Sequence, residues 1–478
     1  MRKHNTCQYL LLLLGLVVAM ATHSDPTDID SIVYFDADIR DAEFCQLSIK
    51  DGKPDFGPNV TNPAMTCPDA FSWHLFAEVI KDKFWLTWAN ERQNWPKDPW
   101  PLCSNASNKE QCCDPASNTN NKEHCPLFPG DDLVAEIKNA KRFTDDKNVV
   151  KSVKRQNQLA IQFLNQNPDL TQTGRPRGKG KLLPLTLADT QGVQECTNEQ
   201  INSILPDHPQ SIGRILRQTN SELTIRNKVF HDYLFDNDLY NSNGVVDIYN
   251  RNNKNQFSNA PFHQKNVSGT PEKQGNLTTI DLPPDAIMLK TNWVSEQLIA
   301  ALKKKYPEDV VAFGDAEDYI RKPLITQLTD GNGKNCNLTG SHWLMSFHIS
   351  SKDIPQWVWT TFEHKDNPGR CDYTGCNDSF GFLANVPESN PATTTNFIAP
   401  NQHSDGLAVP SNVFDPDLQY PDGIQSKALK LLLDNAGIAT SKHSGIHPNI
   451  KDQAWLNYRL KGSQVDFTDH QGRSTLLG

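Results

Sequence analysis

Histidines, tryptophans and a carboxylate gather between residues 340 and 369 more closely than anywhere else in this chain. From Gly340 to Ile349 polar and apolar residues alternate, which predicts a β-strand because successive side chains point to opposite faces. On this pattern His342 and His348 lie on one face of the strand, and Met345 lies on the other face among large apolar residues. Histidine and methionine are side chains that haem iron accepts, and histidine also binds zinc. These three residues are therefore candidate cofactor ligands.

The segment after Pro355 adds a second pair of candidate residues. A proline is tolerated in the first turn of a helix, where its missing N–H would have no partner anyway, so Pro355 predicts a helix that runs to His364. In that helix Trp359 and Glu363 share a face at a spacing of four residues. Glu363 and His364 are the candidate catalytic residues, as acid–base groups or as ligands. The alternative is that they are ordinary charged residues on an exposed surface.

A metal-dependent hydrolase is one function that these residues predict. His342 and His348 on one strand face, joined by His364 or Glu363, would form a three-ligand zinc site with an open position for an activated water. The chain contains no H-E-x-x-H sequence, and the absence of G-x-S-x-G argues against a serine hydrolase of the α/β type. The simpler interpretation is that the two strand histidines form hydrogen bonds on a polar face.

The length of the chain limits the number of domains, and its net charge argues against one class of partner. A chain of 478 residues is long enough for one large domain or for two to three smaller ones, and a hydrophobic content of 37% is compatible with a polar globular protein. The formal net charge is −9. Because an acidic chain is repelled by the phosphate backbone, we expect no nucleic-acid partner.

The N-terminus has the pattern of a secretory signal. Arg2 and Lys3 precede an apolar run from Tyr9 to Ala21, and this run is too short to span a bilayer comfortably. Ala19 and Ala21 supply the small residues that a signal peptidase needs. We therefore expect residues 1–21 to be removed, no stable membrane anchor after cleavage, and a periplasmic or secreted protein.

The apolar patterns predict an α+β fold, with a large mixed domain, long disulfide-stapled loops and a small sheet around residues 286–350. An N-terminal arm over residues 22–66 precedes a domain over residues 67–478, which forms either one unit or two lobes, 67–280 and 281–478. Helices are expected from residue 69, over 132–162, twice between 211 and 241, and over 294–306 and 425–435, and strands over 31–35, 286–293 and 319–328, with a hairpin around Gly462.

Ten cysteines remain once the signal is removed, and an even number in an exported chain predicts disulfide bonds. Four of them, from Cys103 to Cys125, lie in a segment too polar to fold by apolar burial, so we expect bridges to hold it. A zinc site is the alternative there, although the segment contains no C-x-x-C pair. Cys371 and Cys376 are expected to close the loop that follows His364, with Cys336 as a third candidate.

Five segments of the chain form a series: Asn94–Pro96 with the Trp- and Phe-rich helix before it, Val229–Asn241, Met288–Val294, Gly340–Gly369 and Trp455–Asp469. The most specific piece is the W-x-W-x-x-F-E-H-x-D-N block in the fourth segment. In this order the segments resemble exported bacterial proteins of the cytochrome c family. The resemblance runs from about residue 70 to the end of the chain.

The resemblance implies an electron-transfer or redox-associated protein with haem as cofactor and a redox protein as partner. His342, Met345 and His348 would then be the candidates for axial or non-covalent haem ligands. Covalent haem attachment needs C-x-x-C-H, which this chain lacks, because Cys371 and Cys376 are separated by four residues and no histidine follows. Either the chain ends before its haem site, or it is a relative that never binds haem covalently.

A binding protein of the envelope or the secreted fraction, without catalysis, is the remaining alternative. Ten tryptophans, several of them beside Asp, Asn or Glu, suit the recognition of a carbohydrate or a peptide through flat apolar faces. Tryptophans buried in a hydrophobic core are the ordinary explanation of the same composition.

Overall fold

Segments rich in β-branched and aromatic residues form most strands of the computed structural model of this protein, and eight strands join in one sheet. Hydrophobic cores with packed helices lie on both faces of that sheet. The structure describes residues 45, 48–50, 53–57, 60–82, 84–117, 123–129, 173–176, 193–207, 212–254, 280–307, 313–355, 357–371, 376–383, 423–438 and 452–465.

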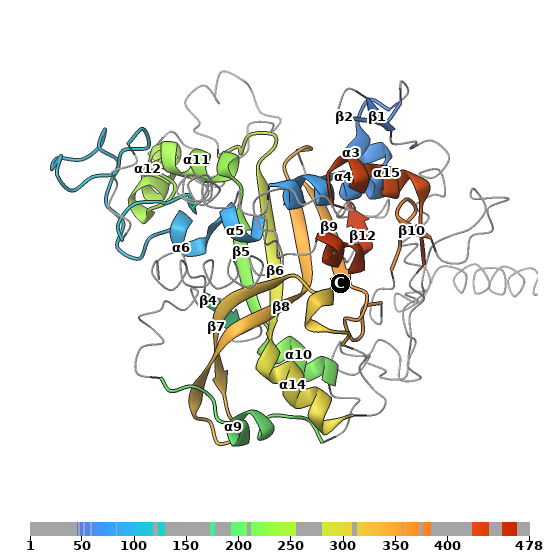
Figure 1. Cartoon of the computed structure of the whole chain (residues 1–478). Helices are drawn as coiled ribbons and strands as arrows, with labels where there is room; N and C mark the ends of the chain where they lie inside the picture. The colour runs from blue at the N-terminus through green and yellow to red at the C-terminus, as the bar shows by residue number, and fades with distance from the viewer. Residues whose placement is uncertain are drawn as a thin grey trace, which may run out of the picture.

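The large sheet has the strand order β12-β9-β8-β6-β5-β4-β7, with β3 paired to β5 (Figure 1). Only β4 and β7 pair in parallel, and the other described neighbours in this sheet are antiparallel. Because β7 also pairs with β8, strands β8, β6, β5, β4 and β7 form a closed ring, while β9 and β12 extend the sheet from β8. The strands are β3 (Ala89–Asn90), β4 (Thr173–Pro176), β5 (Ser221–Arg226), β6 (Ile287–Ser295), β7 (Arg321–Thr329), β8 (Asn335–Ser351), β9 (Val358–His364) and β12 (Tyr458–Gln464).

Strand β8 connects the two parts of the sheet. Its first half pairs with β7 and its second half with β9, while β6 runs along its other edge. The ladder with β6 shifts between the pairs Asn292/Ser346 and Trp293/Leu344, so Met345 is an extra residue in a β-bulge. A shift of one residue exchanges the faces to which the following side chains point.

The larger hydrophobic core lies between helix α4 and one face of the sheet, and it extends to α15. Trp73 and Phe76 of α4 pack on Phe362 of β9, with ring centres 5.0 and 4.6 Å apart. Figure 1 shows α4 and α15 close to the small hairpin of β1 and β2. The elements here are β1 (Ser48–Lys50), β2 (Lys53–Asp55), α3 (Pro63–Thr66), α4 (Pro68–Lys81), α5 (Phe84–Thr87), β10 (Phe382–Leu383), β11 (Ile424–Gln425), α15 (Lys427–Asn435) and the 3₁₀ helix η9 (Asp452–Asn457).

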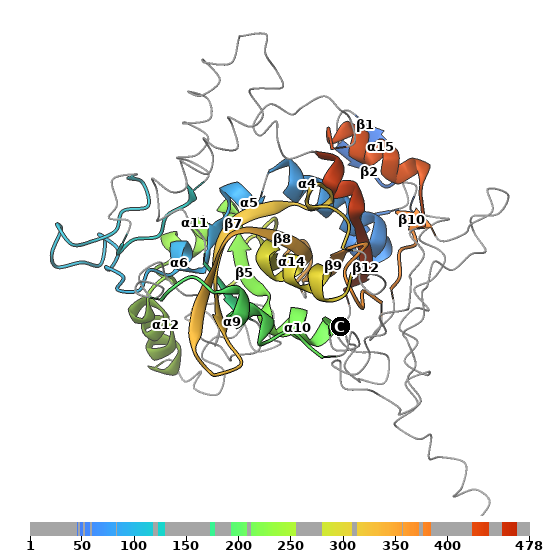
Figure 2. The same ribbon diagram turned by 60° about the horizontal axis from the view of Figure 1, so that its bottom comes forward.

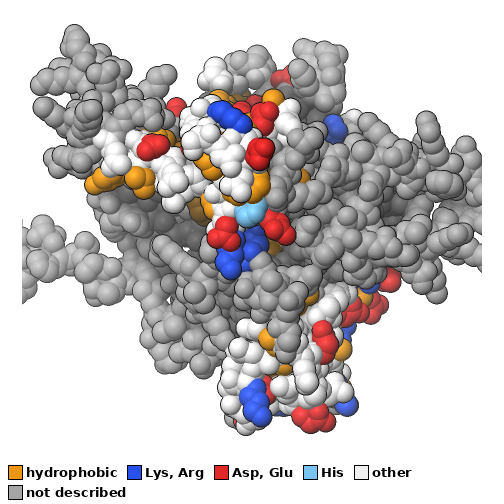
Figure 3. Space-filling view, turned by 90° about the vertical axis from the view of Figure 1, so that its left-hand side faces the viewer, with side chains coloured by type: hydrophobic (Ala, Val, Ile, Leu, Met, Phe, Trp, Pro, Cys, Tyr) orange, Lys and Arg blue, Asp and Glu red, His pale blue; other side chains and the backbone are white. Residues whose placement is uncertain are grey.

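A second core lies beside the curved pair of β7 and β8, where α14 and α10 pack against the sheet (Figure 2). Trp343 and Met345 of β8 are buried there with Leu298 and Leu302 of α14. Helices α6, α11 and α12 lie together on another side of the molecule, and Figure 3 shows acidic and basic side chains next to one another around a histidine on that side. These helices are α6 (Glu91–Asn94), α9 (Asn198–Asn202), α10 (Ile212–Thr219), α11 (Lys228–Asp236), α12 (Ser242–Lys254), α14 (Glu296–Lys305) and the 3₁₀ helix η6 (Ala316–Asp318).

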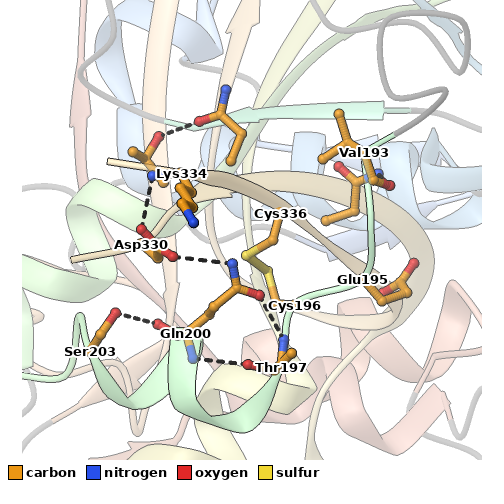
Figure 4. The surroundings of a disulfide bond; sticks show 12 residues. Val193, Glu195, Cys196, Thr197, Gln200, Ser203, Asp330, Lys334 and Cys336 are labelled. Carbon is orange, nitrogen blue, oxygen red and sulfur yellow. Dashed lines mark hydrogen bonds between the residues drawn. A yellow bond between two sulfur atoms is a disulfide. The ribbon is translucent and has the colours of Figure 1, made fainter. Parts of the chain in front are cut away.

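Five disulfide bonds join the ten cysteines that follow the predicted signal: Cys45–Cys67, Cys103–Cys112, Cys113–Cys125, Cys196–Cys336 and Cys371–Cys376. The predicted bridges are confirmed, both in the polar segment and around the loop after β9. Cys336 is bonded to Cys196 and so ties the segment before α9 to β8 (Figure 4). Beside this bond the Gln200 amide donates a hydrogen bond to Asp330 in the turn between β7 and β8, at 3.1 Å.

The predicted α+β class is confirmed, and the sheet is larger than the one expected around residues 286–350. The two helices expected between residues 211 and 241 are present as α10 and α11, with β5 between them. Two local predictions are wrong. Residues Val358–His364 form β9 and not a helix, and Gly462 lies within the single strand β12 and not in a hairpin turn. The predicted signal, the strand over 31–35 and the helix over 132–162 lie outside the described residues.

None of the helices in the described part of the chain is long and apolar enough to cross a membrane.

Candidate functional site

The bulge in β8 separates the two histidines that the sequence placed on one face. Leu344 before the bulge and Phe347 after it both belong to the larger core, although strict alternation would put them on opposite faces. His342 shares the face of Leu344, whereas His348 lies on the opposite face together with Ser346. The two imidazoles therefore do not form a common site on one strand face.

His342 is fully buried, and both of its ring nitrogens have partners. Nδ1 donates a hydrogen bond to the Gly340 carbonyl at 2.9 Å, and Nε2 accepts one from the Thr326 hydroxyl at 2.8 Å. Burial lowers the pKa of His342 to about 4, so the ring is neutral at pH 7. Met345, the other candidate haem ligand, is buried in the second core.

His364 is also buried and engaged on both sides. Its Nε2 donates to the Asp318 carbonyl at 3.1 Å, and its Nδ1 accepts from the backbone N–H of Asp366 at 3.2 Å. The ring stacks on Tyr319 with centres 3.6 Å apart. Burial, assisted by nearby positive charges that include Lys365, lowers the pKa of His364 to about 3. A structural role accounts for each of these contacts.

Within the described residues, no group of three or more His, Cys, Asp or Glu side chains is placed to hold a metal ion. The predicted zinc ligands His342, His348 and His364 thus form no such group. Ligation of a metal or a haem by these residues stays a prediction that depends on a different arrangement of their side chains.

His348 and Glu363 do lie on a common surface, which we call the polar sheet face. It is the face of β5, β6, β8, β9 and β12 that points away from the larger core. His348 shares a hydrogen bond with the Thr361 hydroxyl at 2.7 Å, and Lys290 forms an ion pair with Glu222 at 3.2 Å. Three rows of residues cross the strands on this face: Glu222, Asn292, Ser346, Glu363 and Arg459; Thr224, Lys290, His348 and Thr361; and Arg226, Met288, Ser350, Trp359 and Gln464.

Arg226, at one corner of the polar sheet face, is buried with only 6% of its surface exposed. Its guanidinium lies 4.3 Å from the centre of the Trp95 ring and 5.4 Å from that of Phe230. Among the described residues, Nε and Nη1 of Arg226 have no hydrogen-bond partner. Burial lowers the pKa of Arg226 to about 10, and the charge of Glu91 offsets only part of this effect. The group is nevertheless a cation at pH 7.

Hydrogen bonds and ring contacts hold the aromatic side chains around Arg226 in place. The Trp95 indole donates a hydrogen bond to the Leu239 carbonyl at 3.1 Å. The Phe230 ring lies 6.4 Å from that of Trp357, whose φ of 75° places a non-glycine residue in the left-handed region. Strained backbone of this kind is concentrated at ligand and active sites. We call Trp95, Arg226, Phe230 and Trp357 the arginine–aromatic cluster.

Gln93 of α6, which packs against β5, also has a buried side-chain nitrogen without a hydrogen-bond partner among the described residues. β3 pairs Ala89 with Arg226, and the next residue, Asn90, caps α6 together with Gln93. The Gln93 side chain accepts a hydrogen bond from the Asn90 N–H at 2.8 Å, yet in the described structure its Nε2 is buried without a partner. Buried N–H groups without acceptors are rare in native proteins.

Sequence reasoning missed this cluster. Arg226 continues the polar positions Glu222 and Thr224 of an alternating strand, so its sequence context predicts an exposed side chain. Trp95 and Phe230 each fit the apolar face of a helix or its end. Only the tertiary structure brings the cation and the rings together.

Comparisons with protein-family models, with curated proteins and with solved structures found no match. The resemblance to cytochrome c family proteins therefore stays a prediction.

Proposed function

We propose that this protein is a binding protein without catalysis, and that its ligand carries a carboxylate that is held by Arg226. The observation that carries the proposal is the pair of buried guanidinium nitrogens, Nε and Nη1, that have no acceptor among the described residues. The five disulfides place the folded chain in an oxidising compartment, and we propose that this is the periplasm or the extracellular space.

A bound anion would compensate the buried positive charge of Arg226. A buried charge without a partner is strongly destabilising, whereas a carboxylate supplies both the opposite charge and the missing acceptors. Guanidinium groups match carboxylates in geometry, and stacking on aromatic rings leaves their N–H edges available for hydrogen bonds. The rings of Trp95 and Phe230 therefore hold Arg226 in place without using its donors.

The polar sheet face supports the rest of the ligand. Thr224 is the next residue on the same face of β5, and it pairs across the sheet with Lys290, whose side chain is 42% exposed. His348 pairs with Lys290 on the following strand. A ligand anchored at Arg226 would thus meet hydroxyl, ammonium and imidazole groups in succession, which suits an acidic sugar or an acidic amino acid.

The alternatives from the sequence stay predictions. Electron transfer through a haem and metal-dependent hydrolysis both require imidazole nitrogens that are free to bind a metal. In the structure, both ring nitrogens of His342 and of His364 have hydrogen-bond partners.

The test is calorimetric titration of the purified protein with glucuronate and with glutamate, using glucose and glutamine as uncharged counterparts. We expect heat of binding for at least one carboxylate and none for its uncharged counterpart. Arg226→Gln should weaken that binding roughly tenfold or more, because it removes one partner of a buried charge pair. Lys430→Gln is the matched control, since it removes one positive charge from an exposed ion pair on α15.

The stability of the ligand-free Arg226→Gln variant separates binding from a structural role. Because the substitution removes an uncompensated buried charge, we expect the free energy of unfolding to stay within about 1 kcal/mol of the unchanged protein or to rise. A loss of several kcal/mol, or binding of the carboxylates that is equal in the variant, would contradict the proposal.

A further inference from the structure

The carboxylate of Glu363 holds an amine and an amide at the same time. Lys461 of β12 places its Nζ 3.1 Å from Oε1 of Glu363, and Asn367 donates from Nδ2 to Oε2 at 2.6 Å. The Lys461 and Glu363 side chains are only 9% and 11% exposed. The amine of Lys461 and the carboxamide of Asn367 thus each lie within hydrogen-bond distance of the same carboxylate, in a protected place.

Local structure holds each of the three groups. Lys461 is the extra residue of a bulge between Leu460 and Gly462, and bulges redirect side chains at strand edges. Asn367 is fixed by its backbone, because its N–H donates to the His364 carbonyl at 2.9 Å. The shared carboxylate therefore keeps the amine and the amide near each other, and groups that the fold holds close together react faster than free groups in solution.

We infer that Lys461 and Asn367 join in an intramolecular amide bond, formed by the folded chain itself with Glu363 as proton carrier. The Lys461 ammonium passes a proton to the Glu363 carboxylate, which removes both charges of the buried pair. The neutral Nζ attacks Cγ of Asn367, and a bond forms between these atoms. Glu363 then gives this proton to Nδ2 and takes a second proton from Nζ, the Cγ–Nδ2 bond breaks and ammonia leaves, with Glu363 left protonated. A primary amine and a carboxamide become a secondary amide and ammonia, so no oxidant or other reactant is needed.

The residue after Asn367 removes a competing reaction. Asparagine loses ammonia most readily when the backbone nitrogen of the next residue attacks Cγ, but Pro368 has no N–H with which to do so. Loss of ammonia at Asn367 would therefore report the attack of another nucleophile. The new bond would link the turn after β9 to β12 and would enclose the Cys371–Cys376 loop.

Peptide mapping of the purified protein tests the inference directly. After reduction, alkylation and trypsin, we expect a branched peptide in which residues 366–370 are joined to residues 460–473, lighter than the sum of the two by one ammonia. Modified Lys461 should resist cleavage. Glu363→Gln and Lys461→Arg should each give the linear peptides only, since one lacks the proton carrier and the other the amine nucleophile.

Glu222→Gln is the matched control, because Glu222 forms an ion pair with Lys290 on the same polar sheet face and accepts no hydrogen bond from an asparagine among the described residues. This variant should keep the branched peptide. Linear peptides ending at Lys461 as the main product from the unchanged protein would overturn the inference, even if a variant failed to fold. A Lys461–Glu363 amide, recognised by the loss of water in place of ammonia, would overturn it as well.

Discussion

Single histidines show how burial decides the role of a residue. His231, His342 and His364 are each buried, and burial lowers their pKa values to about 3, 4 and 3. A neutral, hydrogen-bonded imidazole of this kind stabilises the fold without doing chemistry. From the sequence these residues are indistinguishable from ligands, because the residue type is the same and only the surroundings differ.

Acid should destabilise the protein through these residues. Each pKa is lower in the folded chain than in the unfolded chain, so the unfolded state binds more protons, and stability is lost as the pH falls from about 6.5 toward 3. For His364 alone the free energy of unfolding should fall by about 2 kcal/mol between pH 7 and pH 5. Asp378 acts in the opposite direction, because burial and the charge of Asp69 raise its pKa to about 7.

The variant His364→Gln isolates this contribution from the others. Glutamine can donate to the Asp318 carbonyl but cannot be protonated, so the variant should lose less stability than the unchanged protein over the same pH interval. Urea unfolding at both pH values measures the difference. Equal losses in the two proteins would show that His364 titrates in the folded chain as it does in the unfolded one.

At the scale of elements, strand β9 shows which sequence signals were decisive. Pro355 favoured a helix, but Val358, Thr360 and Thr361 are β-branched, and such residues prefer strands. In β9 both edges are paired, with β8 on one side and β12 on the other. Alternation in β9 is incomplete, because Thr360 lies on the core face and Trp359 on the polar sheet face. The β-branched residues and the pairing of both edges therefore outweighed the proline.

The strand β8 was predicted correctly, whereas its bulge was not. A bulge at Met345 depends on how β6 pairs with β8, and no residue type at that position requires it. The face of every later side chain depends on this one insertion. For this reason the positions of His342 and His348 relative to each other were beyond prediction from alternation alone.

The contact between α4 and the loop after Cys376 gives a prediction at the same scale. A Cβ on Gly381 would overlap the indole of Trp73, which donates hydrogen bonds to Asp378. Gly381→Ala should therefore lower the free energy of unfolding by about 1–3 kcal/mol, because a packed core accommodates an added methyl group poorly. Denaturant unfolding followed by tryptophan fluorescence measures it.

Gly437→Ala provides the comparison for Gly381. Gly437 has a φ of 75°, and the position that a Cβ would occupy is open. Gly437→Ala should therefore lower the free energy of unfolding only by the cost of a left-handed backbone, about 1 kcal/mol. The two variants should also differ in kind, since only Gly381→Ala should change the emission of Trp73. An unchanged spectrum together with unchanged stability would mean that α4 moves freely relative to this loop.

For the whole molecule, the sequence predicted that bridges form but not which long-range pair closes. An even number of cysteines in an exported chain and their polar surroundings were enough to expect the local bridges. The bond between Cys196 and Cys336 joins residues 140 apart, and nothing near either cysteine indicates its partner. Such pairs follow from the folded topology, here from the contact between the segment before α9 and β8.

Loop length makes this long-range bond the more stabilising one. In the chain-entropy description, a crosslink restricts the unfolded chain more when it closes a longer loop, which gives about 5 kcal/mol for Cys196–Cys336 and about 2 kcal/mol for Cys371–Cys376. Replacing both cysteines of a pair by alanine should therefore lower the urea midpoint more for the first pair than for the second. Three of the four cysteines are buried and Cys196 is half-buried, and both pairs lose the same atoms, so the packing term does not favour the long-range bond. Equal losses of stability would show that local contacts, and not the restriction of the unfolded chain, determine what each bond contributes.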